Sequence, residues 1–203
     1  MSVYIPTKNR SSLLQRAVNS VFAQTYPNIE LIICDDGSTD DTSAFTQSLT
    51  PKGSVKFIKT LANATSKGAC HARNQAIASA RGDFVTGLDD DDLFQPERIS
   101  LLIAAYEPKY AFVCSAMIWD NGPTQKVIDN VPGIYHLSQQ LDYNEATTQV
   151  LVEKQRVLAV GGFDETFVAC QDYDLWTRLM LAFGPLKRIA EPTYVINNTD
   201  STQ

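Results

Sequence analysis

Four consecutive aspartates are the feature of this sequence that most needs a chemical explanation: Asp89, Asp90, Asp91 and Asp92. Adjacent carboxylates repel one another and gain nothing from packing, so a compensating cation is expected beside them. A hard divalent ion such as Mg²⁺ or Mn²⁺ takes carboxylate oxygens and completes its shell with waters and substrate phosphates. One or two of the four side chains would touch such an ion. The alternative is that some of them cap the helix expected to begin at Pro96.

A second acidic pair, Asp35 and Asp36, ends the apolar run 29–34 and precedes the segment 37–40. A turn with positive φ at Gly37, followed by a helix cap, would explain the residues after the pair. It would not explain two aspartates at the end of an apolar segment. One of them could therefore accept hydrogen bonds from a ribose or from the N–H group of a base.

Two further groups could act on a charged substrate. Arg73 lies in a segment of small and apolar residues that is expected to open a helix. A guanidinium at a helix N-terminus suits an anionic diphosphate, although a surface arginine is the simpler alternative. Asp172 and Asp174 open a later helix, where the helix dipole by itself favours acidic residues. The functional alternative makes one of these aspartates a general base that takes a proton from an attacking hydroxyl.

The elements that must position these groups alternate between short β-rich runs and helical stripes. The strands are predicted at 3–5, 29–34, 55–59, 84–88, 110–116, 147–152 and 186–197. The helices are predicted to start near 11, 39, 66, 96, 154 and 172. This order predicts an α/β fold with a mostly parallel central sheet and helices on both faces. Residues 119–144 are expected to form a long connection with a short hairpin, and residues 198–203 a loose tail.

Parallel strands bring their carboxyl ends to one edge of a sheet, where ligands gather. Pro6 and Thr7 follow the first strand, Asp36 follows the second, and the four aspartates follow the fourth. These groups are therefore expected to meet across one crevice.

Six segments in register carry a resemblance to a known family: 3–10, 33–40, 68–74, 88–92, 161–165 and 171–176. Together they resemble the inverting nucleotide-sugar glycosyltransferases of family 2, which have the GT-A fold. The likeness spans nearly the whole chain. It implies one domain over residues 1–203, with the nucleotide sugar bound by 1–116 and the acceptor by 117–203.

The resemblance also implies roles for individual residues. The donor-binding residues would be Pro6, Thr7, Asp36, Arg73, Asp89 and Asp90. Asp91 would be the ligand of Mn²⁺ or Mg²⁺, and Asp172 would be the catalytic base. The acceptor would be bordered by Gly162, Phe163 and Asp164.

The sequence departs from the family pattern at Gln171, where relatives commonly have glutamate. Glutamine keeps the shape and the hydrogen-bonding capacity but loses the charge, so Glu165 and Asp174 stay open as alternatives for the base. The chain also ends sooner than many relatives, so it could be a truncated or a compact member.

Composition excludes several other classes of protein. A net charge of −6 and a pI near 4.9 argue against a nucleic-acid binder that uses a basic face. No apolar run reaches the roughly 18 residues of a membrane span, and no secretory signal precedes the first strand. Four widely spaced cysteines without a CxxC pair argue against zinc and are expected to be reduced core residues. A cytoplasmic protein is expected, with peripheral association at the inner membrane face left open.

The resulting hypothesis is a metal-dependent inverting transferase that moves a sugar from a UDP-sugar to a hydroxyl of a saccharide or lipid-linked acceptor. A sugar nucleotidyltransferase is the nearest enzymatic alternative. Such an enzyme normally has a glycine-rich, basic loop after the first strand, but residues 6–10 contain no glycine. A non-catalytic nucleotide- or sugar-binding module is the alternative from another class. The oligomeric state stays open.

Overall fold

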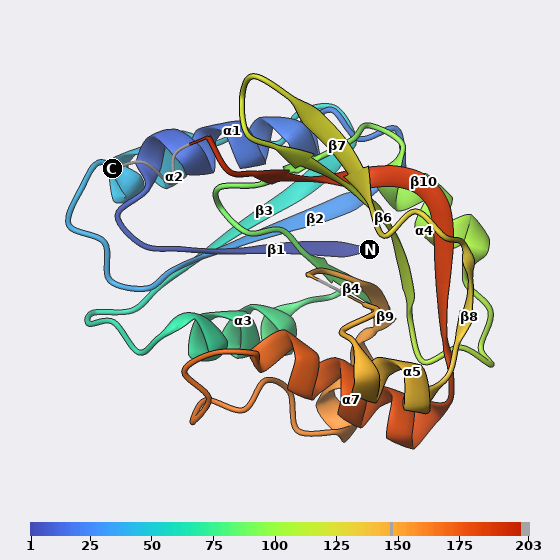
Figure 1. Cartoon of the computed structure of the whole chain (residues 1–203). Coiled ribbons are helices and arrows are strands. Elements are labelled where there is room, and N and C mark those ends of the chain that lie inside the picture. The colour runs from blue at the N-terminus through green and yellow to red at the C-terminus, as the bar shows by residue number, and fades with distance from the viewer. Residues whose placement is uncertain (147, 200–203) are drawn as a thin grey trace.

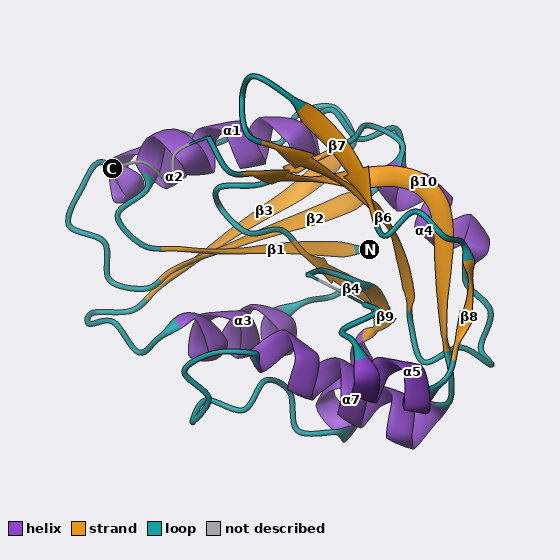
Figure 2. Ribbon diagram, in the orientation of Figure 1, coloured by secondary structure: helices purple, strands orange, loops and turns teal. Residues whose placement is uncertain are grey.

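A computed structural model describes residues 1–146 and 148–199 of the chain. Over this range a ten-stranded sheet carries helices on both faces (Figures 1 and 2). The strands are β1 Ser2–Thr7, β2 Ile29–Asp35, β3 Val55–Ala62, β4 Phe84–Gly87, β5 Leu93–Phe94, β6 Val113–Asp120, β7 Gln125–Ile128, β8 Gly133–Tyr135, β9 Leu151–Glu153 and β10 Leu186–Asn197. The helices are α1 Ser11–Phe22, α2 Thr42–Ser48, α3 Ala69–Ser79, α4 Arg98–Ala105, α5 Leu137–Asp142, α6 Lys154–Ala159 and α7 Gln171–Phe183.

The main path of the sheet has the strand order β3-β2-β1-β4-β9-β6-β10-β5. Strands β3, β2, β1 and β4 pair in parallel, as do β6 and β10. Strand β9 runs antiparallel to both β4 and β6, and β5, β7 and β8 are also antiparallel to their partners. The predicted α/β fold is confirmed, but the sheet as a whole is mixed. The residue pattern of a strand indicates how buried the strand is. It does not indicate whether the strand pairs parallel or antiparallel with a strand that is distant in the sequence.

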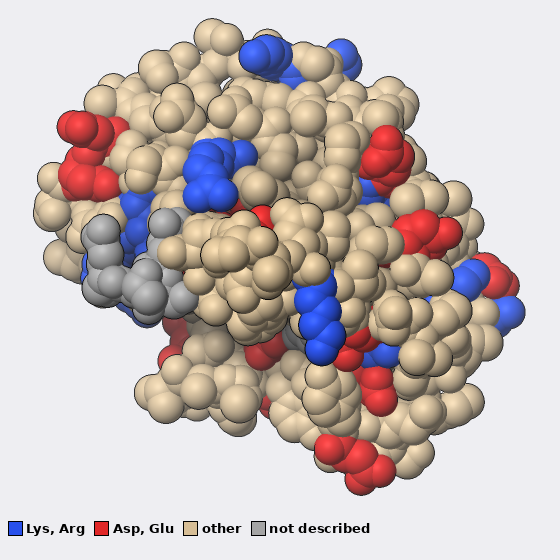
Figure 3. All heavy atoms as spheres, turned by 45° about the horizontal axis from the view of Figure 1, so that its top comes forward, with Lys and Arg blue, Asp and Glu red and all other residues tan. Residues whose placement is uncertain are grey.

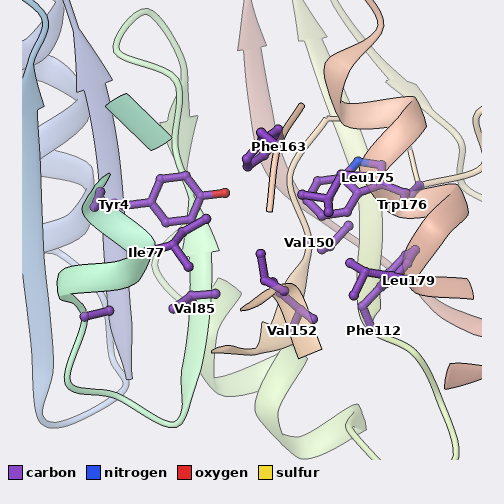
Figure 4. Close-up of a cluster of buried hydrophobic side chains, with 14 of the residues drawn as sticks. Tyr4, Ile77, Val85, Phe112, Val150, Val152, Phe163, Leu175, Trp176 and Leu179 are labelled. Carbon is purple, nitrogen blue, oxygen red and sulfur yellow. The ribbon is translucent and has the colours of Figure 1, made fainter. Parts of the chain in front are cut away.

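Alternating side chains of the central strands supply two cores, one on each face of the sheet. In β1, Val3 and Ile5 face the helix α1, whereas Tyr4 faces α3. The α1 face adds Leu14 and Val18 to its core. The opposite core, drawn in Figure 4, extends from Tyr4 to the aromatic and aliphatic side chains of α7. Side chains of β1 and β2 pack into both cores, so these two strands are held in place from both faces of the sheet. They therefore fix the positions of the residues at their carboxyl ends.

Pro6 does not end the first strand, contrary to the prediction. The Tyr4 carbonyl accepts a hydrogen bond from Leu88 N on the β4 side, and the Thr7 carbonyl accepts one from Asp36 N on the β2 side. Alternate residues of a strand face the same neighbour, so Pro6 faces the β4 side, beyond the end of that strand. No N–H donor is needed there, and the strand can continue through proline.

The remaining boundaries differ where polar groups intervene. Helix α3 begins at Ala69 rather than near 66, because residues 63–68 wrap around Asp36. The connection 119–144 contains the expected hairpin, formed by β6 and β7, and also helix α5, which the prediction missed. The predicted strand at 147–152 starts on a residue outside the described range, and its described part is β9. Most of the predicted loose tail, residues 200–203, also lies outside that range.

The burial of the cysteines agrees with the sequence expectation at three of four positions. Cys34, Cys70 and Cys114 are buried and free as expected, but Cys170 is exposed at the start of α7. In the described range, none of the helices combines the length and hydrophobicity that crossing a membrane requires. On the face in Figure 3 the Lys and Arg side chains stand in separate groups among acidic ones.

Candidate active site

The carboxyl ends of β1, β2 and β4 border a cavity of about 500 Å³. It is lined by Pro6, Thr7, Lys8, Arg10, Asp36, Ser66, Gly68, Ala69, Arg73, Asp89, Asp90 and Asp91. The groups expected to meet after three strands therefore share one hollow. All seven residues expected to bind the sugar donor or the metal are in it. Asp172 and the segment 162–164 are not among its lining residues.

Asp36 organises the loop between β3 and α3. Its two carboxylate oxygens accept four hydrogen bonds: from Asn63 Nδ2 at 2.8 Å, Ser66 Oγ at 2.6 Å, Lys67 N at 2.9 Å and Gly68 N at 2.8 Å. Burial opposes the charge, but these donors outweigh it and lower the pKa of Asp36 to about 2. A carboxylate offers about four acceptor positions, and here all are used by the protein. Asp36 thus shapes the cavity wall, and a hydrogen bond to a nucleotide would have to replace one of the four.

The side chains of Asp89 and Asp90 are held by different cationic partners. Asp89 Oδ1 accepts a hydrogen bond from Arg73 Nη2 at 2.8 Å. Asp90 accepts one from Thr7 Oγ1 at 2.7 Å and one from Arg10 Nη1 at 3.1 Å. Burial opposes the charge on Arg73, yet the adjacent Asp89 raises the pKa of the guanidinium above its ordinary value. Arg73 therefore stays cationic at the cavity wall.

The side chain of Asp91 faces the cavity, whereas that of Asp92 is buried in the protein. Asp91 Oδ2 contacts Arg10 Nη1 at 2.9 Å, and its side chain is 36% exposed in the cavity. Asp92 is buried and accepts hydrogen bonds from Tyr194 Oη at 2.8 Å and Asn197 N at 2.9 Å. Burial raises the pKa of Asp92 to about 7. Only the first three aspartates thus face the cavity, while Asp92 ties the loop to β10.

The cavity offers oxygen ligands of the type that Mg²⁺ and Mn²⁺ prefer, because the carboxylates of Asp89, Asp90 and Asp91 all border it. Across the described range, no group of three or more His, Cys, Asp or Glu side chains is arranged to hold an ion. A metal that takes one or two of these carboxylates and draws its other ligands from a diphosphate and water would fit this donor set. Arg10 lies against Asp90 and Asp91, so a bound ion would compete with it.

Asp172 lies in the first turn of α7, which begins after Cys170 with a left-handed backbone at φ 59°. Asn144 Nδ2 donates a hydrogen bond to Asp172 Oδ2 over 3.3 Å. Burial raises the pKa of Asp172, and the negative charge of Asp89 acts in the same direction. The charge of Asp89 therefore acts on the start of α7 although Asp172 lies outside the cavity lining.

The two alternatives for the base are committed to other partners. Asp174 Oδ2 forms an ion pair with Arg178 Nη2 at 2.6 Å. Glu165 contacts His71 Nδ1 and Asn74 Nδ2, each at 3.1 Å, and the hydrogen bond from Asn74, followed by that from His71, lowers its pKa. Burial raises the pKa of Asp172, whereas hydrogen bonds lower that of Glu165, and a higher pKa makes a carboxylate the stronger proton acceptor.

The segment expected to border the acceptor is mostly buried. Phe163 is 2% exposed and packs against Trp176 in the core of Figure 4, so its ring cannot face an acceptor. Gly162 is also buried. Asp164 alone of the three is exposed, and it accepts hydrogen bonds from the backbone and the hydroxyl of Thr166 at 2.9 and 2.7 Å. The contact of this segment with an acceptor stays a prediction, and Phe163 would contribute to it only as a support.

Five residues that line the cavity were not named as site residues from the sequence: Lys8, Arg10, Ser66, Gly68 and Ala69. Asn144, beside Asp172, was also missed. Arg10 is in the cavity and pairs with two aspartates. Its signal was available, since a cation in the loop after the first strand is a suitable neighbour for an acidic cluster at the same sheet edge. Asn144 contacts Asp172, but it lies in a stretch without periodicity, and no local pattern connects it to α7.

Comparison with known proteins identifies the family of this chain. The model of the family "Glycosyl transferase family 2" matches residues 2–155. The putative colanic acid biosynthesis glycosyl transferase WcaA of Escherichia coli (strain K12) is 32% identical over 97% of this chain and 72% of its own length. The UDP-Glc:alpha-D-GlcNAc-diphosphoundecaprenol beta-1,3-glucosyltransferase WfgD of E. coli is 29% identical over 89% of this chain and 69% of its own.

The solved structure of TarS 1–349 from S. aureus has the same fold. It superposes with a TM-score of 0.82 at 21% sequence identity, and the match covers 97% of this chain but only 60% of TarS 1–349. Complexes of that protein with UDP and with UDP-GlcNAc align at a TM-score of 0.80. Family model, relatives and fold agree: the chain belongs to glycosyl transferase family 2 and is an inverting glycosyltransferase with the GT-A fold.

Proposed function

We propose that this protein transfers a sugar from a UDP-sugar to a hydroxyl group of a saccharide or lipid-linked acceptor, with Mn²⁺ or Mg²⁺ as cofactor. The observation that carries the proposal is the cavity at the ends of β1, β2 and β4, which two arginines and four aspartates line together. A diphosphate bridged to carboxylates by a cation matches this mixture of charges. WfgD, named as a UDP-glucose enzyme, and TarS, solved with UDP and UDP-GlcNAc, support the choice of nucleotide.

The cavity residues hold and orient the donor. Arg73 presents its cation to the diphosphate while Asp89 fixes its position. Pro6 and Thr7 line the cavity, Thr7 against Asp90, and Asp36 keeps the loop 63–68 folded beside the nucleotide. Asp91, with Asp89 and Asp90 beside it, would hold the metal. When bound, the ion supplies positive charge that stabilises the departing UDP. A mannosyltransferase from Pyrobaculum calidifontis of related fold, TM-score 0.67, was solved with GDP-Man and Mn²⁺.

Asp172 is the proposed base. Its carboxylate takes the proton of the acceptor hydroxyl while the oxygen forms a bond to the anomeric carbon. The bond from that carbon to the diphosphate breaks on the opposite face, and its electron pair leaves with UDP. One displacement inverts the configuration, so only one carboxylate is needed at the reacting carbon. The raised pKa of Asp172 makes it a better proton acceptor than an ordinary aspartate.

We also propose a division of labour along the chain. All lining residues of the cavity fall in 1–116, which would bind the nucleotide sugar. Asp172 and the exposed Asp164 fall in 117–203, which would bind the acceptor. A lipid-linked acceptor, such as the diphosphoundecaprenol compound in the name of WfgD, would place the reaction at the inner face of the cell membrane. Polysaccharide biosynthesis is the corresponding process, as the name of WcaA indicates.

The test is calorimetric titration with UDP in the presence of Mn²⁺ and again in excess chelator. We expect binding with the metal and at least a tenfold loss without it. Asp91→Ala should show the same loss in the presence of Mn²⁺, whereas Asp142→Ala, at an exposed aspartate of α5, should bind as the wild type does. Equal affinity for UDP with and without chelator would refute metal dependence.

A further inference from the structure

The side chain of Asn74 forms two hydrogen bonds with the backbone of Phe163, which is 89 positions away in the sequence. Phe163 N donates a hydrogen bond to Asn74 Oδ1, and Asn74 Nδ2 donates one to Phe163 O, both at 2.8 Å. One side chain thereby satisfies both backbone groups of Phe163, as a neighbouring strand would. In Figure 1 helix α3 and the segment that leads to α7 run side by side below the sheet. These two bonds join them.

The segment is shaped to receive this side chain. Gly162 has a φ of +72°, and a Cβ atom at this position would lie 2.6 Å from Asn74 Oδ1. Any side chain here would therefore push the amide away from Phe163. Asn74 Nδ2 also reaches Glu165 Oε1 at 3.1 Å, and His71 Nδ1 reaches Glu165 Oε2 at the same distance. Helix α3 thus contacts the segment at Gly162, Phe163 and Glu165.

The same helix is fixed to the proposed donor site. Gly68 N, directly before α3, donates a hydrogen bond to Asp36 at 2.8 Å. Arg73 pairs with Asp89 at 2.8 Å, and its guanidinium lies 5.5 Å from the centre of the Phe163 ring. Residues 73 and 74 are consecutive: one faces the aspartate cluster and the other holds the segment before α7. If a bound diphosphate displaced Arg73, the movement would be transmitted to Phe163 in two ways: through the contact of Arg73 with its ring and through the hydrogen bonds of Asn74 with its backbone.

We propose that Asn74 is a positioning residue that couples occupation of the nucleotide cavity to the order of the segment 161–169, which precedes Asp172. This inference rests on the proposed function for the assignment of the cavity to a nucleotide. It gives Asn74 no contact with the reacting atoms. Its role is to hold the acceptor-side segment in one place relative to the donor.

The test is hydrogen exchange of peptides covering 161–169, measured without ligand and with UDP and Mn²⁺. In the wild type we expect UDP to slow exchange of this segment. In Asn74→Ala the unliganded segment should exchange about tenfold faster, as the loss of backbone hydrogen bonds implies. UDP should then no longer slow it, although UDP affinity stays within about twofold of the wild type. Asn19→Ala, the same change on the exposed face of α1, is the matched control.

Gly162→Ala is a second variant that disrupts the contact between Asn74 and Phe163, here by a change in the segment instead of in α3. It should produce the same faster exchange and the same loss of response to UDP, and the double variant should be no worse than the more affected single variant. Unchanged exchange in Asn74→Ala, or a UDP response that survives in it, would overturn the inference. A wild type that fails to bind UDP would instead overturn the proposed function, and the unliganded exchange rates would still decide the positioning role.

Discussion

The fold treats two carboxylates in opposite ways, one that lines the cavity and one at the start of α7. Asp36, on the cavity side, accepts four hydrogen bonds, and its pKa falls to about 2. Asp172, at the start of α7, is reached by Asn144 over 3.3 Å, and burial raises its pKa. The first carboxylate is a fixed structural charge. The second keeps the capacity to take up a proton.

This difference separates binding from chemistry. On the cavity side the negative charges of Asp89 and Asp90 are matched by Arg73 and Arg10, so the region is organised before any ligand arrives. Preorganised charge stabilises a leaving group without the cost of rearrangement. On the α7 side a carboxylate with a raised pKa is poised for proton transfer. Substitutions on the two sides should therefore impair nucleotide binding and sugar transfer separately.

The largest effect is expected from Asp172→Asn. The amide keeps the shape of the side chain but cannot accept the proton, so transfer should fall by roughly a thousandfold or more. UDP affinity should stay within about twofold, because Asp172 lies outside the cavity lining. The measurement is UDP release with the nucleotide sugar that most stabilises the wild type in a thermal-shift panel with Mn²⁺.

Matched variants identify the base among its neighbours. Asp174→Asn and Glu165→Gln remove carboxylates that are already paired with Arg178 and His71. Each should retain far more transfer than Asp172→Asn. Turnover near the wild-type level in Asp172→Asn would move the role of base to whichever of these two variants is inactive.

The acid side of the pH profile gives a second test of Asp172. The base must be ionised, so kcat/KM should fall about tenfold for each pH unit below its pKa. Burial raises that pKa, so the decline should begin at a higher pH than an ordinary aspartate would give. The hydrogen bond from Asn144 favours the charged form, and Asn144→Ala should therefore shift the decline to still higher pH. A shift to lower pH would contradict this assignment.

On the cavity side, Asp36→Asn should act on stability before it acts on chemistry. The pKa of Asp36 falls from its ordinary value of 3.8 to about 2, which corresponds to roughly 2 kcal/mol of folding free energy at neutral pH. This contribution is complete above the unfolded-state pKa and is lost as the pH falls towards 2. Urea unfolding at pH 7 should show a loss of about that size, while Asp41→Asn, at an exposed position, should show little. Equal stability of the two variants would mean that the four hydrogen bonds contribute nothing net.

The same contrast governs what the sequence could predict. Apart from Arg73 in α3, the donor residues lie at or just after the carboxyl ends of β1, β2 and β4, and parallel strands bring these ends together whatever the details of packing. Local patterns were therefore sufficient to group Thr7, Asp36 and Asp91. They could not reveal that Asp36 would use all its acceptor positions within the protein, because its partners come from a loop without regular structure.

The α7 side depends on contacts between distant segments, and these were not predictable from local patterns. Phe163 was expected at the acceptor, but its ring fills the core beside Trp176. The hydrophobicity of a phenylalanine next to a glycine turn is compatible with either place. Helix α5, which precedes Asn144, was missed because it has only six residues and no clear stripe. Such elements are defined by what they pack against.

The smallest effect is expected from Arg10→Gln, and it probes how the cavity balances its charges. Arg10 Nη1 lies 3.1 Å from Asp90 and 2.9 Å from Asp91, on a side chain that is half exposed. An exposed ion pair contributes little to stability, so the unfolding free energy should change by less than about 1 kcal/mol. Without the guanidinium, Mn²⁺ no longer competes for the two carboxylates and should bind the nucleotide-free protein a few-fold more tightly. UDP with Mn²⁺ should gain less, because the diphosphate loses a nearby cation. Calorimetric titration with Mn²⁺ alone decides the matter: weaker metal binding in Arg10→Gln would show that the arginine positions these carboxylates for the ion instead of competing with it.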